Sequence, residues 1–424
     1  MKEIRIGILG WGVVGDGVIK LLQERGEEIT RRTGVRVVIK KVCDIDLERP
    51  REVKLPSSLL TTQAEEVIED ENIDVVVELI GGIHPAREYI ISSLEKGKDV
   101  VTANKALLAA EGKEILEKAR ERGRRVYFEA SVMSGVPLLR SLREGMVACK
   151  VEEVLGIING TTNFILTRME EGKSFQEALR TAQEKGFAES DPSLDVEGWD
   201  TAHKLSILSY LCFGTWPPSE DAFLVEGISR IGKEDIEYAK ELGYRVKLLA
   251  VGKLREERLE LRVSPTLLPE DHPLAGVREE FNAVYLKTDT LGEVTFQGKG
   301  AGSLPTANGV ISDIVEAAGE DSPLLPPSHP LPLIKREEVV LPYYLRFRLE
   351  DKPGVLAKIA GILGKRGISI SSVVQKGREK KGGVPVIMTT HQAREGDIKK
   401  ALEEIDSLPV VKDRTCLIRM EKEY

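Results

Sequence analysis

Cysteine and histidine are scarce in this chain of 424 residues. The four cysteines lie far apart and form no CxxC pair, so the sequence predicts neither a disulfide framework nor a cysteine-based zinc site. Reduced, buried thiols are expected instead. The five histidines are scattered and support no metal cluster. These scarcities exclude a metal site of the familiar Cys/His type.

Long hydrophobic runs and an excess of positive charge are also missing. No apolar run approaches the roughly 20 residues that span a bilayer, and the first residues enter a strand without the features of a secretory signal. The formal net charge is -8, which argues against a nucleic-acid partner because phosphate neutralisation needs a basic face. We expect a cytoplasmic protein that contacts no membrane and binds a small molecule.

The length predicts two or three domains. Residues 1–136 alternate short β-branched runs with helical patterns, which is typical of a parallel α/β sheet covered on both faces. Ligands of such sheets bind at the carboxyl ends of the strands. Residues 137–303 are first helical and then extended, which indicates a second, α+β domain. A helix at about 304–320 is expected to pack back against the first domain.

Proline is concentrated in one late segment, and it marks a boundary. Residues 321–341 contain "SPLLPPSHPLPLIKREE", which can continue neither a helix nor a central strand and is therefore interpreted as a linker. Residues 342–424 follow the order strand, helix, strand, strand, helix, strand. This pattern predicts a third, small domain.

A glycine-rich turn, "GWGVVG", follows the first strand and opens a helix. Gly10, Gly12 and Gly15 are in GxGxxG register, with Trp11, Val13 and Val14 between them. The glycines permit a tight turn and close backbone approach, and the helix N-terminus attracts a pyrophosphate. Together with its strand and helix context, the motif predicts a dinucleotide site and a Rossmann-type first domain.

The acidic residue that should contact the ribose stands at the end of the second strand. Asp44 would suit the hydroxyl groups of NAD, whereas the nearby Lys40, Lys41 and Arg49 could accept the 2′-phosphate of NADP. The sequence leaves the choice between NAD and NADP open.

The second domain contains a lysine that several acidic residues precede in the sequence. On a helix running from Asp195 to Phe213, Asp200 and Lys204 share one face with apolar residues. Burial lowers the pKa of an ammonium toward working pH, which suits proton transfer. The alternative is an ordinary i, i+4 salt bridge. Lys105 follows a strand end of the first domain and is either a second catalyst or a helix-start lysine.

Six segments in order give the chain a clear resemblance: "GWGVVG", "VTANKALLA", "FEASVMSGVPLL", "GIINGTTNFIL", "GFAESDPSLDVEGWDTAHKL" and "GKGAG". Over nearly its whole length the chain is similar to homoserine dehydrogenases with a C-terminal ACT domain. The resemblance implies interconversion of L-homoserine and L-aspartate 4-semialdehyde with NAD or NADP, in threonine, methionine and isoleucine biosynthesis. No kinase portion precedes the first strand, so we expect a monofunctional enzyme.

The resemblance also implies roles for the residues of the substrate site. Lys204 would be the catalytic lysine, and Lys105 would share its work at the crevice of cofactor and substrate. Glu189 and Asp200 would hold the amino group of homoserine, supported by Asp195. The segment with Asn159, Gly160 and Thr161 would line the pocket. Without the resemblance, this segment would be an ordinary N-cap with Thr161 or Thr162 starting a helix.

Two further segments acquire ligands through the resemblance. In "EASVMSGVP", the carboxylate of Glu129 and the carbonyl groups of Val132, Ser134 and Val136 would surround a monovalent cation, sodium, since all are hard oxygen ligands. Additional cofactor contacts would come from Thr102, just before Lys105, and from Gly302. A plain strand-to-helix turn and a plain glycine-rich turn are the alternatives.

The C-terminal domain resembles an ACT domain, a ferredoxin-like fold that commonly pairs with another copy. L-Threonine would be the natural effector, bound near the turn with Asp351, Gly354, Val355 and Leu356. The same domain could instead serve only as a dimer contact. We expect a homodimer or a dimer of dimers.

Two other functions compete with this interpretation. Aspartate semialdehyde dehydrogenase shares substrate and cofactor but needs a nucleophilic cysteine, and none of the four cysteines stands in a convincing site. The alternative outside enzymology is an amino-acid-sensing regulator that keeps the nucleotide fold without catalysis. The acidic residues around Lys204 argue against it.

Overall fold

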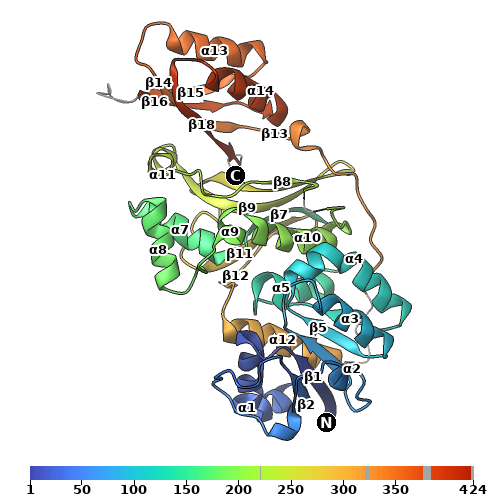
Figure 1. Ribbon diagram of the computed structural model, residues 1–424. Helices are drawn as coiled ribbons and strands as arrows, with labels where there is room; N and C mark the ends of the chain where they lie inside the picture. Colours follow the sequence, from blue (N-terminus) through green and yellow to red (C-terminus); the bar gives the residue numbers. More distant parts are fainter. Residues whose placement is uncertain (220, 320–324, 376–382, 422–424) are drawn as a thin grey trace. The chain divides into compact units, whose positions relative to one another are not determined.

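The computed structural model describes residues 1–219, 221–319, 325–375 and 383–421 (Figure 1). The chain divides into two compact units by packing. Unit 1 comprises Met1–Val151, His203–Glu220 and Lys287–Leu331, and unit 2 comprises Glu152–Ala202, Asp221–Leu286 and Pro332–Tyr424. Among the described residues, no helix is both long and apolar enough to cross a bilayer.

Unit 1 is built on a six-stranded parallel sheet with the order β3-β2-β1-β4-β5-β6. Its strands are β1 (Lys2–Leu9), β2 (Val35–Cys43), β3 (Leu60–Thr61), β4 (Val75–Glu78), β5 (Asp99–Thr102) and β6 (Val126–Tyr127). The order reverses between β1 and β4, and ligands of open parallel sheets bind at such a point. The predicted Rossmann-type fold is confirmed, although the short β3 was not expected.

Helices cover both faces of this sheet, as a parallel sheet requires. The elements besides the strands of the sheet are α1 (Val13–Thr33), η1 (Ser57–Leu59), α2 (Glu65–Ile68), α3 (Ala86–Glu95), α4 (Lys105–Glu121), α5 (Ala130–Met133), α6 (Leu138–Arg140), η2 (Ser141–Gly145), β12 (Gly292–Lys299) and α12 (Ser303–Ala317). Alternate residues of β1, such as Ile6 and Ile8, pack under α1 and α12, which lie side by side (Figure 1). Leu9 instead faces Val67 and Ile73 on the other side.

Unit 2 contains a mixed sheet with the order β11-β7-β9-β10-β18-β14-β16-β15, and β8 pairs with β10. The elements of its first part are β7 (Val151–Ile157), α7 (Gly160–Glu170), α8 (Phe175–Glu184), α9 (Ser193–Val196), β8 (Leu224–Val225), α11 (Lys233–Glu241), β9 (Tyr244–Arg255), β10 (Arg258–Pro269) and β11 (Phe281–Thr288). β9 and β10 form a long antiparallel hairpin from Tyr244↔Pro269 to Arg255↔Arg258.

The acidic segment does not form one continuous helix. Gly198 has a φ of +90° and ends α9, and a new helix, α10 (Trp199–Phe213), follows it. The expected helix from Asp195 to Phe213 is therefore wrong at its start, because a left-handed glycine interrupts the helical backbone. Asp200 and Lys204 still lie one turn apart on α10.

The C-terminal part of unit 2 has the predicted order of elements. They are η3 (Arg336–Glu338), β13 (Val340–Leu341), β14 (Tyr343–Leu349), α13 (Val355–Lys365), β15 (Ile370–Gln375), β16 (Val384–Thr390), β17 (Ala393–Arg394), α14 (Glu395–Asp406) and β18 (Val411–Met420). The antiparallel order β18-β14-β16-β15 is ferredoxin-like and confirms the expected ACT fold. Residue 320 of the expected helix, residues 321–324 of the expected linker, and residues 376–382 and 422–424 of this domain lie outside the described residues.

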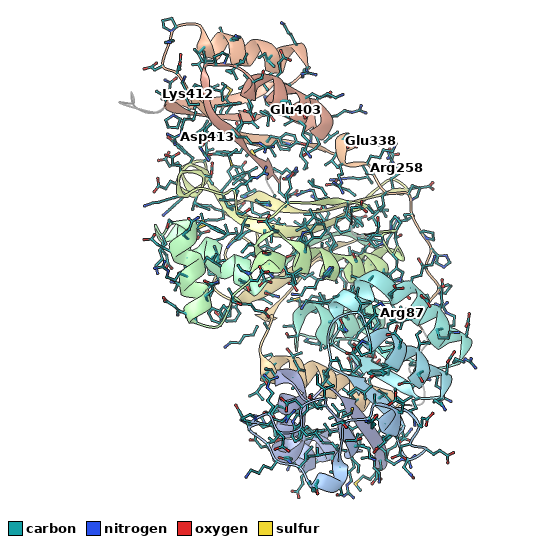
Figure 2. The ribbon with its side chains drawn as sticks, in the orientation of Figure 1. Arg87, Arg258, Glu338, Glu403, Lys412 and Asp413 are labelled. Atoms are coloured by element: carbon teal, nitrogen blue, oxygen red, sulfur yellow. The ribbon has the colours of Figure 1, made fainter. Side chains whose placement is uncertain are left out.

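The last strand of unit 2 joins the two parts of its sheet. Arg419 and Met420 of β18 pair in parallel with Thr266 and Leu267 of β10. A second tie is made at the end of the linker, where the Arg258 guanidinium donates to the Glu338 carboxylate at 2.6 Å (Figure 2). The ACT-like domain is therefore continuous with the preceding part of unit 2.

Candidate active site

The glycine turn between β1 and α1 leaves no room for side chains at two of its glycines. A Cβ atom on Gly10, whose φ is +100°, would lie 2.7 Å from the Leu79 carbonyl oxygen, and one on Gly15 would lie 2.4 Å from the Gly10 oxygen. At Gly12 a Cβ would meet nothing within 4 Å. Gly12 thus borders open space, where the N–H groups of Val13 and Val14 begin α1 and can meet a pyrophosphate.

Asp44 and Arg51 lie beside this glycine turn. The Trp11 backbone N–H donates to the Asp44 carboxylate at 2.6 Å, and the Arg51 guanidinium lies 3.5 Å from the same carboxylate. Arg51 also stacks over the Trp11 ring, 4.3 Å from its centroid. Sequence reasoning named Arg49 but missed Arg51, which stands two residues further along the chain. Lys41 instead pairs with Glu66 at 2.6 Å.

The carboxyl ends of β4 and β5 carry a buried polar relay. The Thr102 hydroxyl donates to the Glu78 carboxylate at 2.6 Å and accepts from the Asn104 N–H at 3.0 Å. Asn104 caps α4 by accepting from the Leu107 N–H at 3.1 Å. Lys105 is the first residue of that helix and is partly exposed. The Thr102 hydroxyl is buried in this relay, so its structural role is to hold the start of α4.

The second glycine-rich turn lies against the first. Gly302 has a φ of +118° and caps α12, and the Ser303 hydroxyl donates to the Val13 carbonyl at 2.8 Å. A Cβ on Gly17 would come within 2.5 Å of the Ser303 oxygen. The structure therefore brings Gly302 to the N-terminus of α1, beside the turn that is predicted to bind the dinucleotide.

The expected cation loop is buried and rich in oxygen atoms. The Glu129 carboxylate accepts from the Leu139 and Arg140 N–H groups at 2.9 and 2.6 Å, while the Glu129 N–H donates to Asp313 at 2.8 Å. Burial raises the pKa of Glu129, and burial together with the nearby Glu129 charge raises that of Asp313 well above its ordinary value. A monovalent cation would relieve this pair, so the donor chemistry fits one.

The remaining members of that loop are fixed by other contacts. Val132 is buried, and Ser134 has a φ of +55° with its hydroxyl donating to the Gly300 carbonyl at 2.9 Å. The Val136 carbonyl accepts from the Leu138 N–H at 2.7 Å. Among the described residues, no group of three or more His, Cys, Asp or Glu side chains is arranged to hold a metal ion.

Asn159 is the centre of the acidic site in unit 2. It is the N-cap of α7, and its side-chain oxygen accepts from the Thr162 N–H at 2.8 Å. Its amide nitrogen donates to Asp195 at 2.6 Å and to Asp200 at 2.8 Å. Two carboxylates thus converge on one neutral amide, and carboxylates can accept hydrogen bonds from an ammonium group. The alternative of an ordinary N-cap, with Thr161 or Thr162 starting the helix, differs from the structure only in that α7 begins one or two residues earlier, at Gly160.

The other predicted substrate residues differ in their placement. A Cβ on Gly160 would lie 2.7 Å from the Glu280 carbonyl oxygen, so only glycine fits there. The Thr161 hydroxyl donates to the Phe187 carbonyl at 2.6 Å. Glu189 is exposed and uses its backbone carbonyl to accept from Gln183. Hydrogen bonds therefore unite Asn159 with two aspartates, whereas the side chain of Glu189 is exposed.

Lys204 occupies the apolar side of α10. Its neighbours Leu205, Ile207 and Leu208 are fully buried, and both Lys204 and Asp200 expose only 7% of their surface. An ammonium group in such a place is protected from bulk water and suited to exchanging a proton with a ligand. This burial is the condition that a catalytic role for Lys204 requires.

The cysteines have the opposite of nucleophilic character. Burial raises the pKa of Cys43 to about 11 and that of Cys212 to about 12, and it also raises the pKa of Cys416. All four cysteines are free. A thiolate nucleophile at these three positions would need the reverse shift.

The expected effector turn joins β14 to α13. Gly354, with a φ of +86°, is the N-cap of α13, and Asp351 before it is exposed. Val355 packs into the core of the domain, whereas Leu356 is 39% exposed. The turn thus presents a carboxylate and one apolar side chain at the surface.

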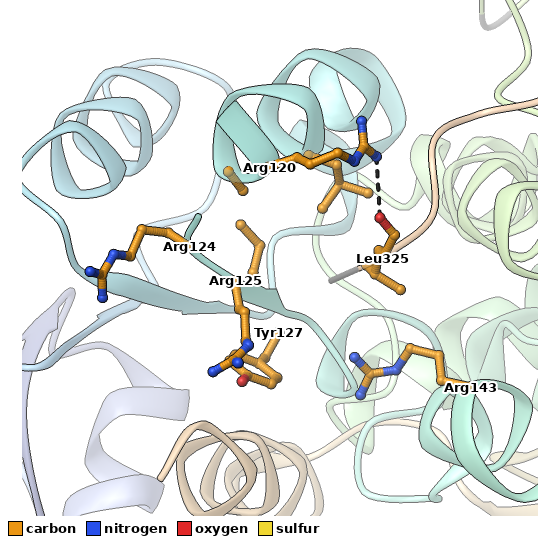
Figure 3. Close-up of a pocket in the computed structure, with 9 residues that line it drawn as sticks. Arg120, Arg124, Arg125, Tyr127, Arg143 and Leu325 are labelled. Carbon is orange, nitrogen blue, oxygen red and sulfur yellow. Dashed lines mark hydrogen bonds between the residues drawn. The ribbon is translucent and has the colours of Figure 1, made fainter. Parts of the chain in front are cut away.

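A separate pocket in unit 1 is lined by basic residues. Figure 3 shows Arg120, Arg124, Arg125 and Arg143 around Tyr127, with Arg120 donating to the Leu325 carbonyl at 3.2 Å. The cavity measures about 20 Å³, enough for about one water molecule. It contains none of the predicted site residues.

Known proteins resemble the chain over its whole length. The family model "Homoserine dehydrogenase, NAD binding domain" matches residues 10–129, "Homoserine dehydrogenase" matches residues 137–315, and "ACT domain" matches residues 343–410. The homoserine dehydrogenase of Bacillus subtilis is 41% identical over 431 residues, covering 99% of each chain.

Two solved structures extend this likeness to the fold. A homoserine dehydrogenase from Thiobacillus denitrificans is 42% identical with a TM-score of 0.92, over 99% of both chains. A hyperthermophilic archaeal homoserine dehydrogenase in complex with NADPH is 27% identical with a TM-score of 0.64, over 76% of this chain and 100% of that one.

Proposed function

Because the chain belongs to the homoserine dehydrogenase family, we propose that it interconverts L-homoserine and L-aspartate 4-semialdehyde with a nicotinamide dinucleotide. One observation carries the proposal beyond family membership. Asn159 holds Asp195 and Asp200 together within 2.8 Å of one amide, and Asp200 is one helical turn from the buried Lys204. This arrangement suits a substrate that carries an ammonium group and a reacting oxygen.

Each residue of this cluster has a separate task in the proposed reaction. Asp195 and Asp200 accept hydrogen bonds from the substrate ammonium, and Asn159 fixes the two carboxylates. Lys204 gives a proton to the aldehyde oxygen when hydride arrives from the bound nicotinamide and removes it in the reverse direction. Lys105 supports the same oxygen. Glu189 joins the ammonium site only if its exposed loop turns inward.

The nicotinamide cofactor supplies the hydride, and the chain supplies its binding site. We propose that the N–H groups after Gly12 bind the pyrophosphate and that Gly302 offers a second backbone contact. Arg51 would meet a 2′-phosphate, whereas Asp44 would accept from ribose hydroxyl groups. The stacked Arg51 favours NADP, which is consistent with the NADPH named for the archaeal relative.

A monovalent cation, sodium, is proposed at the loop of Glu129, Val132, Ser134 and Val136. The support is the buried carboxyl pair of Glu129 and Asp313, for which a cation offsets the cost of ionisation. Such an ion would stabilise the turn that connects β6 to α6. It takes no part in proton or hydride transfer in this proposal.

We propose that the ACT domain serves in regulation and assembly. L-Threonine is proposed to bind near Asp351, Gly354, Val355 and Leu356 and to inhibit the enzyme, since the turn exposes both a carboxylate and an apolar side chain. We also propose, from the family, that the protein forms a homodimer or a dimer of dimers. It would act in the cytoplasm, in threonine, methionine and isoleucine biosynthesis.

The decisive experiment is an assay of the full chain with L-homoserine and either NAD⁺ or NADP⁺. The proposal expects nicotinamide reduction that depends on homoserine and loses rate when threonine is added. If dinucleotide binds but no substrate is turned over, the protein is an amino-acid-sensing regulator instead.

A further inference from the structure

The segment Glu226–Gly227 packs against Val196 and Glu197, which directly follow Asp195 of the acidic site in unit 2. A Cβ on Gly227 would fall 2.0 Å from the Val196 carbonyl oxygen and 2.3 Å from the Glu197 Cα. The Ile228 N–H donates to that same Val196 carbonyl at 2.8 Å. The residue after Asp195 is therefore seated on Gly227, and only a glycine allows the two backbones to approach so closely.

The same segment is anchored to the sheet. Val225 pairs with Val263 of β10, and the Glu226 N–H donates to the Val263 carbonyl at 2.9 Å. β18 pairs with β10 three residues further along, through Thr266↔Arg419. β8 and the last residues of β18 are thus successive partners of one strand.

The Glu226 side chain bridges the two. Its carboxylate accepts from the Arg419 guanidinium at 2.7 Å, and Arg419 is 1% exposed. The Arg419 Nε also donates to Glu395 at 3.0 Å, and Tyr343 donates to the same Glu395 carboxylate at 2.9 Å. Burial works against ionisation of Glu226, yet the charge of Arg419 prevails and holds the pKa of Glu226 below its ordinary value.

We propose that Glu226 and Gly227 are positioning residues for the substrate, and that Arg419 of the C-terminal strand holds them in place. The inference rests on the proposed function. Arg419 fixes Glu226, Gly227 fixes the backbone of Val196, and this backbone sets Asp195 at 2.6 Å from Asn159. The ammonium site of unit 2 is accordingly completed by a strand that belongs to the ACT-like domain.

The first test is Gly227→Ala in the full chain, with KM values for homoserine and for the dinucleotide measured separately. The added methyl group must displace Val196, so the KM for homoserine should rise by about tenfold or more, while kcat changes by less than about threefold. The dinucleotide KM should not move. Gly276→Ala is the matched control, because that glycine is exposed and a Cβ there would meet nothing within 4 Å.

Glu226→Gln tests the clamp without a steric change, and Arg419→Lys tests whether a shorter cation restores it. We expect the homoserine KM to rise by about threefold to tenfold for Glu226→Gln and by less for Arg419→Lys. Glu234→Gln is the control, since the Glu234 carboxylate also joins α11 to the ACT-like domain, through Arg348 at 2.7 Å and Arg346 at 3.9 Å of the same strand. This control should leave the homoserine KM unchanged.

The possible outcomes separate the two proposals. A wild-type chain without homoserine-dependent turnover would overturn the proposed function. An active wild type in which Glu226→Gln and Gly227→Ala match their controls in homoserine KM would overturn only the positioning role. If Gly227→Ala does not fold, Glu226→Gln and Arg419→Lys still decide the question.

Discussion

The glycine turn of unit 1 and the asparagine-centred site of unit 2 offer ligands different parts of the chain. At the glycine turn the groups that face a ligand are backbone N–H groups, and side chains matter mainly by being absent at Gly10 and Gly15. Around Asn159 the groups are side chains, two carboxylates and an amide, and their charge matters. The first site should be sensitive to added volume, and the second to lost charge.

The largest effect on catalysis is expected at Lys204, because this residue is proposed to transfer a proton in the reaction itself. Lys204→Ala should lower kcat by about 10² to 10⁴, the usual contribution of a general acid. Dinucleotide binding, followed by cofactor fluorescence, should persist. Lys113→Ala, on the exposed side of α4, is the control and should behave like the wild type. Turnover that survives in Lys204→Ala would remove the catalytic role.

Loss of charge in unit 2 should come next. Asp200→Asn keeps the shape of the side chain but removes one of the carboxylates held by Asn159, so kcat/KM for homoserine should fall by about 10- to 100-fold. The dinucleotide KM should stay within about twofold of wild type. If the KM values for homoserine and for the dinucleotide both changed, the Asn159 site and the glycine turn would not act as separate binding sites.

Added volume in unit 1 should give the converse pattern. Gly15→Ala places a methyl group 2.4 Å from the Gly10 carbonyl oxygen, so the turn must shift and the dinucleotide KM should rise by about tenfold. Gly26→Ala, in open space on α1, is the control and should stabilise the helix by about 0.5–1 kcal/mol. An unchanged dinucleotide KM in Gly15→Ala would contradict a backbone-made site.

Arg51 is the exception to the backbone-made site of unit 1, because its side chain is expected to distinguish NADP⁺ from NAD⁺. Arg51→Ala should raise the KM for NADP⁺ by about tenfold and leave that for NAD⁺ nearly unchanged. Steady-state rates with both cofactors, side by side, measure this. Equal effects on the two cofactors would reduce Arg51 to a packing residue over Trp11.

The smallest functional effect is expected at Lys247, which supports α7 from below. Its ammonium donates to the Val277 carbonyl at 2.6 Å and to Asn163, and burial lowers its pKa from 10.5 to about 8. Between about pH 8 and 10.5 the unfolded chain keeps a proton that the folded chain has lost, so stability rises with pH in that window.

Comparison with Lys247→Met isolates this group. The free energy of unfolding of the wild type should gain up to about 3 kcal/mol on the variant as pH rises from 8 to 10.5, while kcat stays similar. Chemical denaturation across this pH range measures the difference. Parallel stability curves would mean that the pKa of Lys247 is not depressed.

Sequence reasoning reached further in unit 1 than in unit 2 for a physical reason. A turn that excludes Cβ atoms must contain glycines at fixed spacing, and strands covered on both faces must be apolar runs, so both leave local patterns. Arg51 was not predicted because its partner Trp11 lies 40 residues away in the chain. β3 was not predicted because a strand of two residues shows no periodic pattern.

In unit 2 the informative contacts are distant in sequence. Asn159 meets Asp200 across 41 residues, and Arg419 meets Glu226 across 193, so neither pair has a local signature. The break at Gly198 could have been expected from the glycine itself, since a left-handed residue commonly ends a helix. The pairing of β18 with β10 could not, because each strand alone is an ordinary strand.

The recognition of an ammonium by the Asn159 cluster is tested most directly by removing that ammonium from the substrate. With the wild type, kcat/KM for 4-hydroxybutanoate, which is homoserine without its amino group, should be about 100-fold lower than for L-homoserine. In the Asp195→Asn, Asp200→Asn double variant this difference should shrink to less than about threefold. A wild type that oxidises both alcohols equally well would contradict the account.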